Sequence, residues 1–279
     1  MKVTLNQKQG RLLRAYYRQG ISWLISSALL LILLLISSFI LLLWFPLDQD
    51  IFNMALTILY FPIGLVLFHR LKLAKLRLNL VPISPQQLPE VYEIVVEVCQ
   101  QAGLKKIPSV YLSNDLEVDP CVQTPGLRKS IVISSDFLAG CRENQTPEAL
   151  RFMVAHQVGH FVFNHHRNYW LIFSATGFAT PGFGMAMAKN LEYSADAWAA
   201  QQIPAGAFRA LTLCAVGKDN FPYLNPAEDF SEKLYSPGIF GFIARWTTVR
   251  VPVRNRLRAL KKVGLLDVSQ ETAPERNAF

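Results

Sequence analysis

Residues 147–166 read PEALRFMVAHQVGHFVFNHH, and this stretch decides the fold. The Thr-Pro-Glu sequence at 146–148 is typical of a helix start, with a capping oxygen, a proline at the first helical position and a carboxylate in the first turn. We therefore expect a helix over about 147–164. Because His156 and His160 are four residues apart, both imidazoles project from one face, at the spacing that a tetrahedral zinc ion needs from two ligands.

A second stretch supplies a candidate for the next ligand. Residues 191–200 read LEYSADAWAA and predict a downstream helix. Glu192 is the candidate third ligand. Asp196 lies one helical turn further along the same face, where its carboxylate can accept a hydrogen bond from a ligand histidine. Gly159, inside the first helix, costs about 1 kcal/mol relative to alanine, which indicates that another part of the chain packs closely against it.

Two uncharged apolar runs precede this region. Residues 21–45 and 51–68 are 25 and 18 residues long, enough to cross about 30 Å of hydrocarbon, and the second run contains Pro62. The five residues between the runs, PLDQD, allow only a tight turn. The sequence therefore predicts a two-helix transmembrane hairpin over 21–68.

The formal charge of +8 is concentrated beside these runs. Residues 1–80 hold nine Lys or Arg against two Asp, whereas residues 81–279 hold nineteen Lys or Arg against eighteen Asp or Glu. Positive flanks stay in the cytoplasm, so we expect a basic cytoplasmic N-terminus over 1–20, a basic juxtamembrane connector over 69–83, and both termini in the cytoplasm. The connector is either a helix on the membrane surface or an extension of the second span. The charge pattern indicates contact with anionic lipid and no nucleic-acid partner.

The rest of the chain predicts helices around a small sheet. Residues 89–102 have apolar positions at helical spacing, and residues 109–113 and 130–134 are short β-branched runs typical of strands. The expected fold class is α+β. A mostly helical domain with a small sheet occupies 84–262, the transmembrane hairpin precedes it, and a tail over 263–279 follows.

Taken together, these stretches resemble the integral-membrane zinc peptidases that include the HtpX-type heat-shock protease and the CaaX prenyl protease. The resemblance covers about residues 84–262 and rests on the two quoted helices, the strand-loop-strand before them and the membrane hairpin. In that family the first helix carries H-E-x-x-H, and a later E-x-x-x-D supplies the third ligand. The resemblance implies a metallopeptidase-like fold in which His156, His160 and Glu192 hold zinc and Asp196 contacts a ligand histidine.

Position 157 departs from the family pattern. It holds Gln157, whereas the family has a glutamate there as the general base that takes a proton from the attacking water. A neutral amide has no basic site, so we expect catalysis to be weaker by about 10²–10⁴ while zinc binding survives. The loop DPCVQ at 119–123 and the lack of a His-Pro in 249–260 are further departures. Gln157 is either an engineered substitution that traps a working protease or the result of natural divergence.

Other polar residues have simpler interpretations. His165 and His166 lie off the ligand face and are expected at the surface. The basic residues within 245–262 are expected to form a solvated face, in which Arg256 is the candidate to orient a site carboxylate. The cysteines form no C-x-x-C pair, so we expect them to be reduced packing residues. They are Cys99, Cys121, Cys141 and Cys214.

The sequence thus predicts a membrane-anchored zinc metalloendopeptidase that acts on protein or peptide substrates at the cytoplasmic membrane face, with low or no activity because of Gln157. One alternative is a catalytically dead pseudoprotease that binds membrane-protein segments, and another is a metal-free scaffold. Residues 169–188 are also apolar, but a crossing there would separate Glu192 from His156. We therefore expect this stretch to fold back, lie in the interface or be buried beside the zinc helix, with a bend at 181–184.

Overall fold

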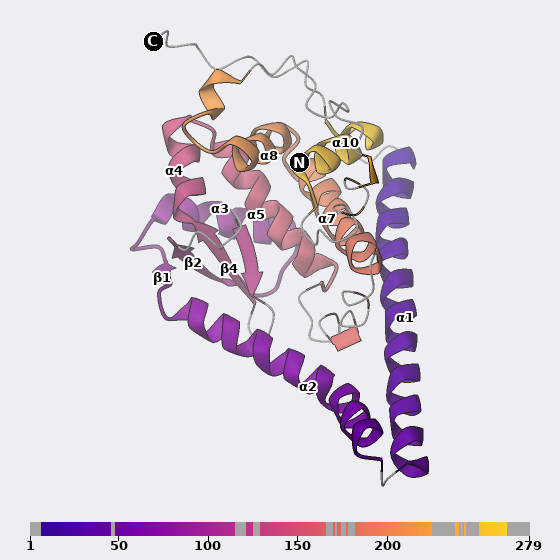
Figure 1. The fold of residues 1–279 in the computed structure, drawn as a ribbon. Helices are drawn as coiled ribbons and strands as arrows, with labels where there is room; N and C mark the ends of the chain where they lie inside the picture. The colour runs from indigo at the N-terminus through magenta and orange to yellow at the C-terminus, as the bar shows by residue number, and fades with distance from the viewer. Residues whose placement is uncertain are drawn as a thin grey trace.

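The computed structural model shows a mostly helical domain with a small sheet, carried on two long N-terminal helices (Figure 1). The expected α+β class and the helical pair before the domain are confirmed at this level. The description that follows covers residues 7–45, 48–114, 121–124, 129–165, 170, 172, 173, 177, 182–224, 238, 239, 241, 243 and 251–266.

The two N-terminal helices are longer than the apolar runs that predict them. Helix α1, Gln7–Trp44, is uninterrupted and begins well before residue 21, so residues assigned to a separate basic N-terminus belong to the same helix. Helix α2, Gln49–Arg77, contains Pro62 and continues into the basic connector. The connector is therefore helical as far as Arg77 and continuous with the second apolar run. The helices meet at a tip far from the domain and diverge towards it (Figure 1).

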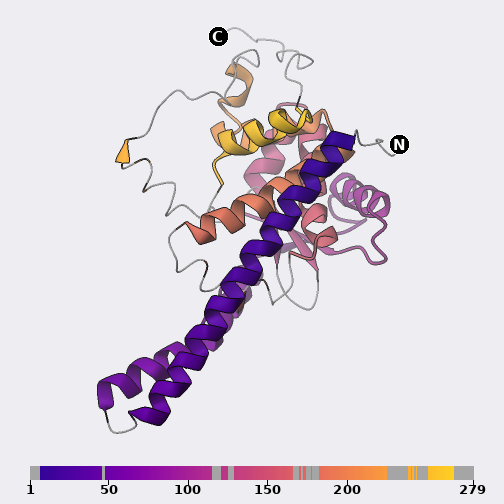
Figure 2. The ribbon, with the colours of Figure 1, turned by 90° about the vertical axis from the view of Figure 1, so that its right-hand side faces the viewer.

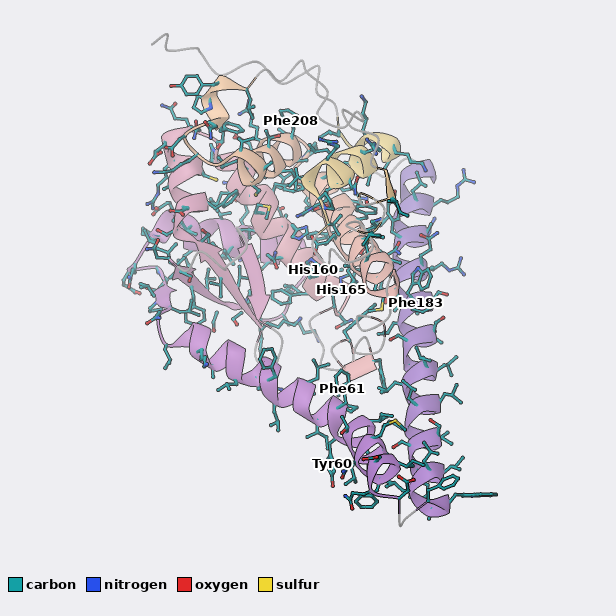
Figure 3. The ribbon with its side chains drawn as sticks, viewed as in Figure 1. Tyr60, Phe61, His160, His165, Phe183 and Phe208 are labelled. Atoms are coloured by element: carbon teal, nitrogen blue, oxygen red, sulfur yellow. The ribbon has the colours of Figure 1, made fainter. Side chains whose placement is uncertain are left out.

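Both helices expose apolar side chains along about the same length. Large exposed apolar residues occur on α1 from Ile25 to Trp44 and on α2 from Met54 to Leu71, and α1 and α2 are each long and apolar enough to cross a membrane. At 1.5 Å per residue, residues 25–44 span about 30 Å, the thickness of a bilayer's hydrocarbon core. Figure 3 shows Tyr60 and Phe61 on this part of α2. Near the tip, the Ser38 hydroxyl donates to the Ala55 carbonyl oxygen at 2.6 Å and joins the two helices.

The N-terminal half of α1 packs against the domain instead. It lies along α7, Phe183–Gln202, as Figure 2 shows. The rings of Tyr16 and Tyr193 are 5.4 Å apart, and those of Trp23 and Phe183 are 4.6 Å apart, both edge to face. One helix therefore links the apolar band directly to the helix that carries Glu192.

The sheet contains both expected strands, β2, Ser109–Ser113, and β4, Ser130–Ser134, and these pair in parallel. Two shorter strands complete it in the order β1-β2-β4-β3, each antiparallel to its neighbour. They are β1, Val81–Ile83, and β3, Cys121–Thr124. The sequence did not predict these two. β3 lies within the segment expected to be a loop.

Helix α5, Pro147–Val162, is the centre of the domain and confirms the predicted helix. From Ala149 to Phe161 all its residues except Arg151 are buried, as expected of a helix that other elements cover on every side. The elements packed on it include α3, Pro89–Gln101, α4, Ser135–Glu143, α7 and α8, Gly206–Val216. The remaining described helices are the 3₁₀ helix η1, Phe221–Tyr223, and α10, Val253–Val263.

Two local expectations need correction. Thr146 precedes α5, but its side chain makes no capping hydrogen bond; instead its backbone N–H donates to the Cys141 carbonyl oxygen at 2.8 Å. Helix α7 begins at Phe183 and not at Leu191, so the end of the apolar stretch 169–188 forms its first turns. The predicted bend is present, because Gly182 has φ 85°, a conformation that favours glycine.

Candidate metal centre

Close packing of α5 on α7 positions the candidate ligands. A Cβ added to Gly159 would meet the Ala195 carbonyl oxygen and the Trp198 ring at 3.3 Å each, so the two helices approach where α5 has no side chain. This contact is the close packing that the glycine predicts. It brings Glu192, one turn before Ala195 on α7, over the face of α5 that carries His156 and His160.

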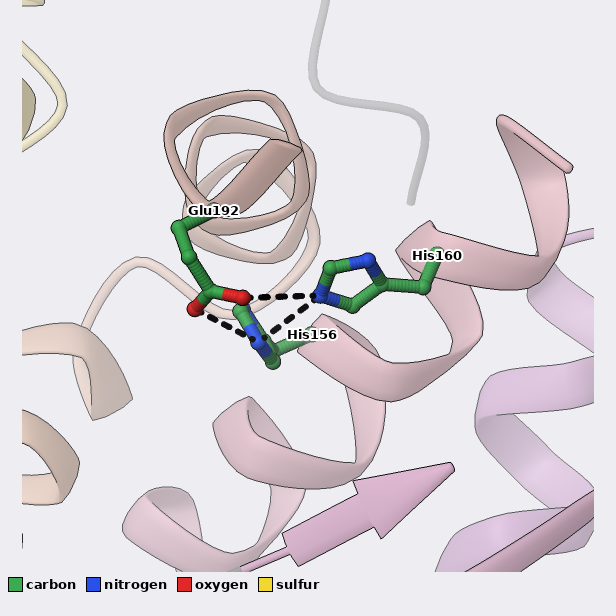
Figure 4. A group of neighbouring side chains, drawn as sticks. All are labelled: His156, His160 and Glu192. Atoms are coloured by element: carbon green, nitrogen blue, oxygen red, sulfur yellow. Dashed lines mark hydrogen bonds and ion pairs between the residues drawn. The ribbon is translucent and has the colours of Figure 1, made fainter. Parts of the chain in front are cut away.

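The three candidate ligands point towards one another (Figure 4). The Nε2 atoms of His156 and His160 are 3.2 Å apart. One oxygen of Glu192 lies 3.5 Å from Nε2 of His156, and the other lies 3.5 Å from Nε2 of His160. Ligand atoms bound tetrahedrally at zinc's 2.0–2.2 Å bond lengths are separated by about 3.3–3.6 Å. The two 3.5 Å contacts are made by different oxygens of Glu192, and one ligand atom from each of the three residues lies within 4.8 Å of the others. The donor types and spacings therefore fit one metal ion held by these residues.

Two further residues lie at the Nδ1 side of His156, opposite the ligand cluster. Its Nδ1 atom lies 2.8 Å from Oδ1 of Asp196, so the imidazole N–H donates to that carboxylate while Nε2 faces the ligand cluster. The guanidinium of Arg256, from α10, contacts both oxygens of Asp196, with Nε 2.7 Å from Oδ2 and Nη2 2.5 Å from Oδ1. Its Nη1 atom also lies 3.4 Å from Oε2 of Glu192. Arg256 thus contacts both carboxylates of the centre, as expected of a residue that orients them.

The electrostatics favour ionised Glu192 and Asp196 carboxylates and a neutral His160. Burial by itself raises the pKa of the Glu192 carboxyl, but the charge of Arg256 and the interactions with the two histidines outweigh it, so its pKa lies below the ordinary value. The pKa of Asp196 is lowered in the same way, again against its burial and mainly by Arg256. Burial lowers the pKa of His160. The carboxylates are therefore ionised and His160 is neutral, with a lone pair for a cation.

His165 is not at the surface, and that expectation is wrong. Its side chain is buried, and its Nδ1 atom lies 3.0 Å from Nδ1 of His160. Figure 3 shows the two histidines side by side within the domain. The expectation assumed that the helix continues through residue 165. Because α5 ends at Val162, helical spacing does not give the direction of later side chains.

Several other predicted features are placed only in part. His166, Asp119 and Pro120 lie outside the described residues, as do Arg245 and Arg250 of the basic cluster. On α10, Arg254, Lys261 and Lys262 are exposed, in keeping with a solvated face. Cys99 and Cys141 are buried free thiols and Cys214 is half-buried, as expected for packing residues.

Comparison with known proteins adds nothing to this geometry, since no family model, no curated protein and no solved structure matches the chain.

Proposed function

We propose that the chain is a membrane-anchored zinc protein of the metalloendopeptidase kind, with its centre at His156, His160 and Glu192. The observation that carries this proposal is the convergence of a His, a second His four residues later and a Glu from another helix. One ligand atom from each lies within 4.8 Å of the others, and the two histidine Nε2 atoms are 3.2 Å apart. When bound by three protein ligands, zinc keeps a fourth position at which it activates water for attack on a carbonyl group. The ligand set is therefore that of a hydrolytic centre.

Gln157 limits what such a centre achieves. It follows His156 directly on α5 and is buried. A carboxylate there would act as the general base, a role that contributes about 10²–10⁴ in rate, but an amide takes up no proton. We expect the protein to bind zinc and polypeptide while cutting slowly. The same residue supports the second candidate, a pseudoprotease that holds a membrane-protein segment without cutting it.

The position of the centre along α1 supports a substrate at the membrane surface. Tyr17 of α1 stacks against His165, which contacts the ligand His160. Tyr17 is eight residues before Ile25, where the exposed apolar band begins, so the centre lies about 12 Å beyond that band along the helix axis. An unfolded or juxtamembrane polypeptide segment is therefore the proposed ligand.

The edge strand β3, beside α5, offers backbone groups with which an extended peptide can form hydrogen bonds. β3 stands at the end of the strand order and contacts α5. Backbone groups on the outer side of an edge strand are the usual docking site for an added strand. We propose that a polypeptide segment lies along β3, next to the metal centre.

The topology is proposed with the cytoplasmic side at the domain. The basic residues flank the apolar band on the side of the domain, at Arg11, Arg14 and Arg18 on α1 and at Arg70 and Lys75 on α2. The tip carries Asp48 and Asp50 and no base. Cysteine labelling from either side of sealed vesicles tests this: a tip residue accessible only from the cytoplasmic side would contradict it.

The direct test of function is Gln157→Glu. In detergent-solubilised, zinc-loaded protein, the restored carboxylate should raise hydrolysis of an unfolded substrate such as casein by about 10² or more. A Gln157→Glu/His156→Ala double variant serves as the control, because a contaminating protease would survive in it. Recovery that vanishes in the double variant supports the peptidase. No recovery with zinc still bound would favour the pseudoprotease.

A further inference from the structure

The end of α5 is a turn that carries His165 back over the helix. Phe163 caps the helix and Asn164 adopts the left-handed conformation, with φ 59°. The His165 N–H donates to the His160 carbonyl oxygen at 2.9 Å, and the Asn164 N–H donates to the Phe161 carbonyl oxygen at 3.3 Å. This pair of bonds is the Schellman motif, in which the second residue past the cap contacts the third-last residue of the helix. Here those two residues are both histidines.

The contact between the two side chains is directed. Nδ1 of His165 lies 3.0 Å from Nδ1 of His160, while Nε2 of His160 faces Glu192 and His156. A neutral imidazole has one N–H and one lone pair. The lone pair on Nε2 of His160 faces the ligand cluster, so the ring proton of His160 is on Nδ1. This Nδ1–H donates a hydrogen bond to the lone pair on Nδ1 of His165.

Packing fixes the ring of His165 in this orientation. It is only 7% exposed. Its ring centroid lies 5.6 Å from that of Phe163, 5.4 Å from that of Trp170 and 6.4 Å from that of Tyr17 on α1. Aromatic side chains from the turn, from beyond it and from the helix that carries the apolar band therefore enclose the imidazole. The acceptor atom is held in place before any metal binds.

We propose that His165 is a positioning residue that orients His160 for the metal by accepting the hydrogen bond from its Nδ1–H. This inference rests on the proposed metal centre. Each ligand histidine then has a hydrogen-bond acceptor for its Nδ1–H, Asp196 for His156 and His165 for His160. Such partners hold the tautomer and ring angle of a ligand, and their loss typically weakens metal binding by 10–100-fold.

Two variants separate the hydrogen bond from the packing. His165→Asn keeps an acceptor close to the position of Nδ1 but loses the ring. His165→Phe keeps an aromatic ring among Tyr17, Phe163 and Trp170 but has no acceptor. The measurement is the zinc dissociation constant of the full-length protein in detergent, by competition with a chromogenic chelator. We expect His165→Phe to bind zinc about 10–100-fold more weakly than the unaltered chain, and His165→Asn to recover at least half of that loss on a logarithmic scale.

The absorption spectrum of bound Co²⁺ is a second measurement, and a change in packing alone does not alter it. Visible absorption bands of Co²⁺ bound in place of zinc report ligand geometry, so His165→Phe should shift them and His165→Asn should restore them. If His165→Phe equals the unaltered chain, or if His165→Asn binds no better than His165→Phe, the proposal is overturned while the metal centre stands. If the unaltered chain itself binds no zinc, both the metal centre and this inference fail.

Discussion

Oδ1 of Asp196 lies 2.8 Å from Nδ1 of His156, on the side of the imidazole that faces away from Glu192. Arg256 contacts the same carboxylate through two nitrogens, so a guanidinium, a carboxylate and an imidazole from α10, α7 and α5 form one chain of contacts that ends at the candidate metal. Asp196 is almost fully buried, which makes the two charges depend on each other.

That dependence predicts the behaviour of Asp196→Asn. We expect zinc affinity to fall by about 10–100-fold, because the amide accepts the His156 N–H more weakly than a carboxylate does. The metal-free protein should also unfold at a lower temperature, since Arg256 then lacks its closest counter-charge in the interior. Chelator competition and thermal unfolding measure the two effects.

The control for that variant is the double change Asp196→Asn/Arg256→Met. Removing both charges should give a metal-free protein that is more stable than Asp196→Asn alone, because no guanidinium is left buried without its closest counter-charge. Glu192 also loses its contact with Arg256, but its side chain is 28% exposed and water reaches it. Zinc affinity of Asp196→Asn within twofold of the unaltered chain would show that this carboxylate does not support His156.

The approach of α5 to α7 predicts the effect of a side chain at Gly159. Gly159→Leu would push against Ala195 and Trp198 and move α7, and Glu192 with it, away from the histidines. We expect zinc binding to weaken by at least tenfold, with α-helical circular dichroism retained. Val162→Leu, on the exposed last turn of the same helix, is the matched control and should bind zinc normally. Equal zinc affinity in both variants would contradict the packing argument.

Sequence reasoning reached the centre where local spacing decides the geometry. The i, i+4 histidines, the carboxylates of Glu192 and Asp196 and the glycine at 159 are all read from periodicity or from family resemblance, and the structure places them together. His165 was missed because the helix pattern was extended past Val162. The available signal was Asn164, since asparagine is one of the few residues that adopt the left-handed conformation that ends a helix.

The rest of the fold depends on contacts distant in sequence. The early start of α7 was missed because residues 183–188 are apolar. Burial in the domain and packing on α1 both account for this, and composition does not separate these causes from membrane burial. The strand β3 was missed because four residues flanked by Pro and Gly carry almost no pattern of their own; pairing with β4 defines it. The length of α1 was also missed, since its polar first half is held on the domain by rings that lie far along the chain.

Thiol reactivity should show how tightly the domain core is packed. Burial raises the pKa of Cys99 to about 11 and that of Cys141 to about 12, so both thiols stay protonated, and unreactive, at pH 8. In a Cys121→Ser/Cys214→Ser chain, we expect almost no alkylation of the folded protein and two modified thiols after unfolding. Rapid alkylation without unfolding would mean that the core is open.

The same shifts set the sign of an alkaline effect. The folded pKa of each thiol lies above the ordinary value of 9.0, so the folded state holds these protons more tightly than the unfolded chain. Their contribution to stability is complete below about pH 9 and is lost as pH rises from there to about 12. Replacing both cysteines with alanine should therefore make the unfolding temperature less sensitive to pH over that window. An unchanged pH dependence of the unfolding temperature would contradict the raised pKa values of the two thiols.

The measurement that tests the central claim most directly is the zinc content of purified protein, compared between the unaltered chain and His160→Ala. The three candidate ligands predict about one zinc per chain in the first and almost none in the second. His69→Ala, on α2, serves as the control that keeps its zinc. Equal zinc in the unaltered chain and in His160→Ala would show that the metal binds elsewhere. No zinc in either, after reconstitution with excess metal, would contradict the centre itself.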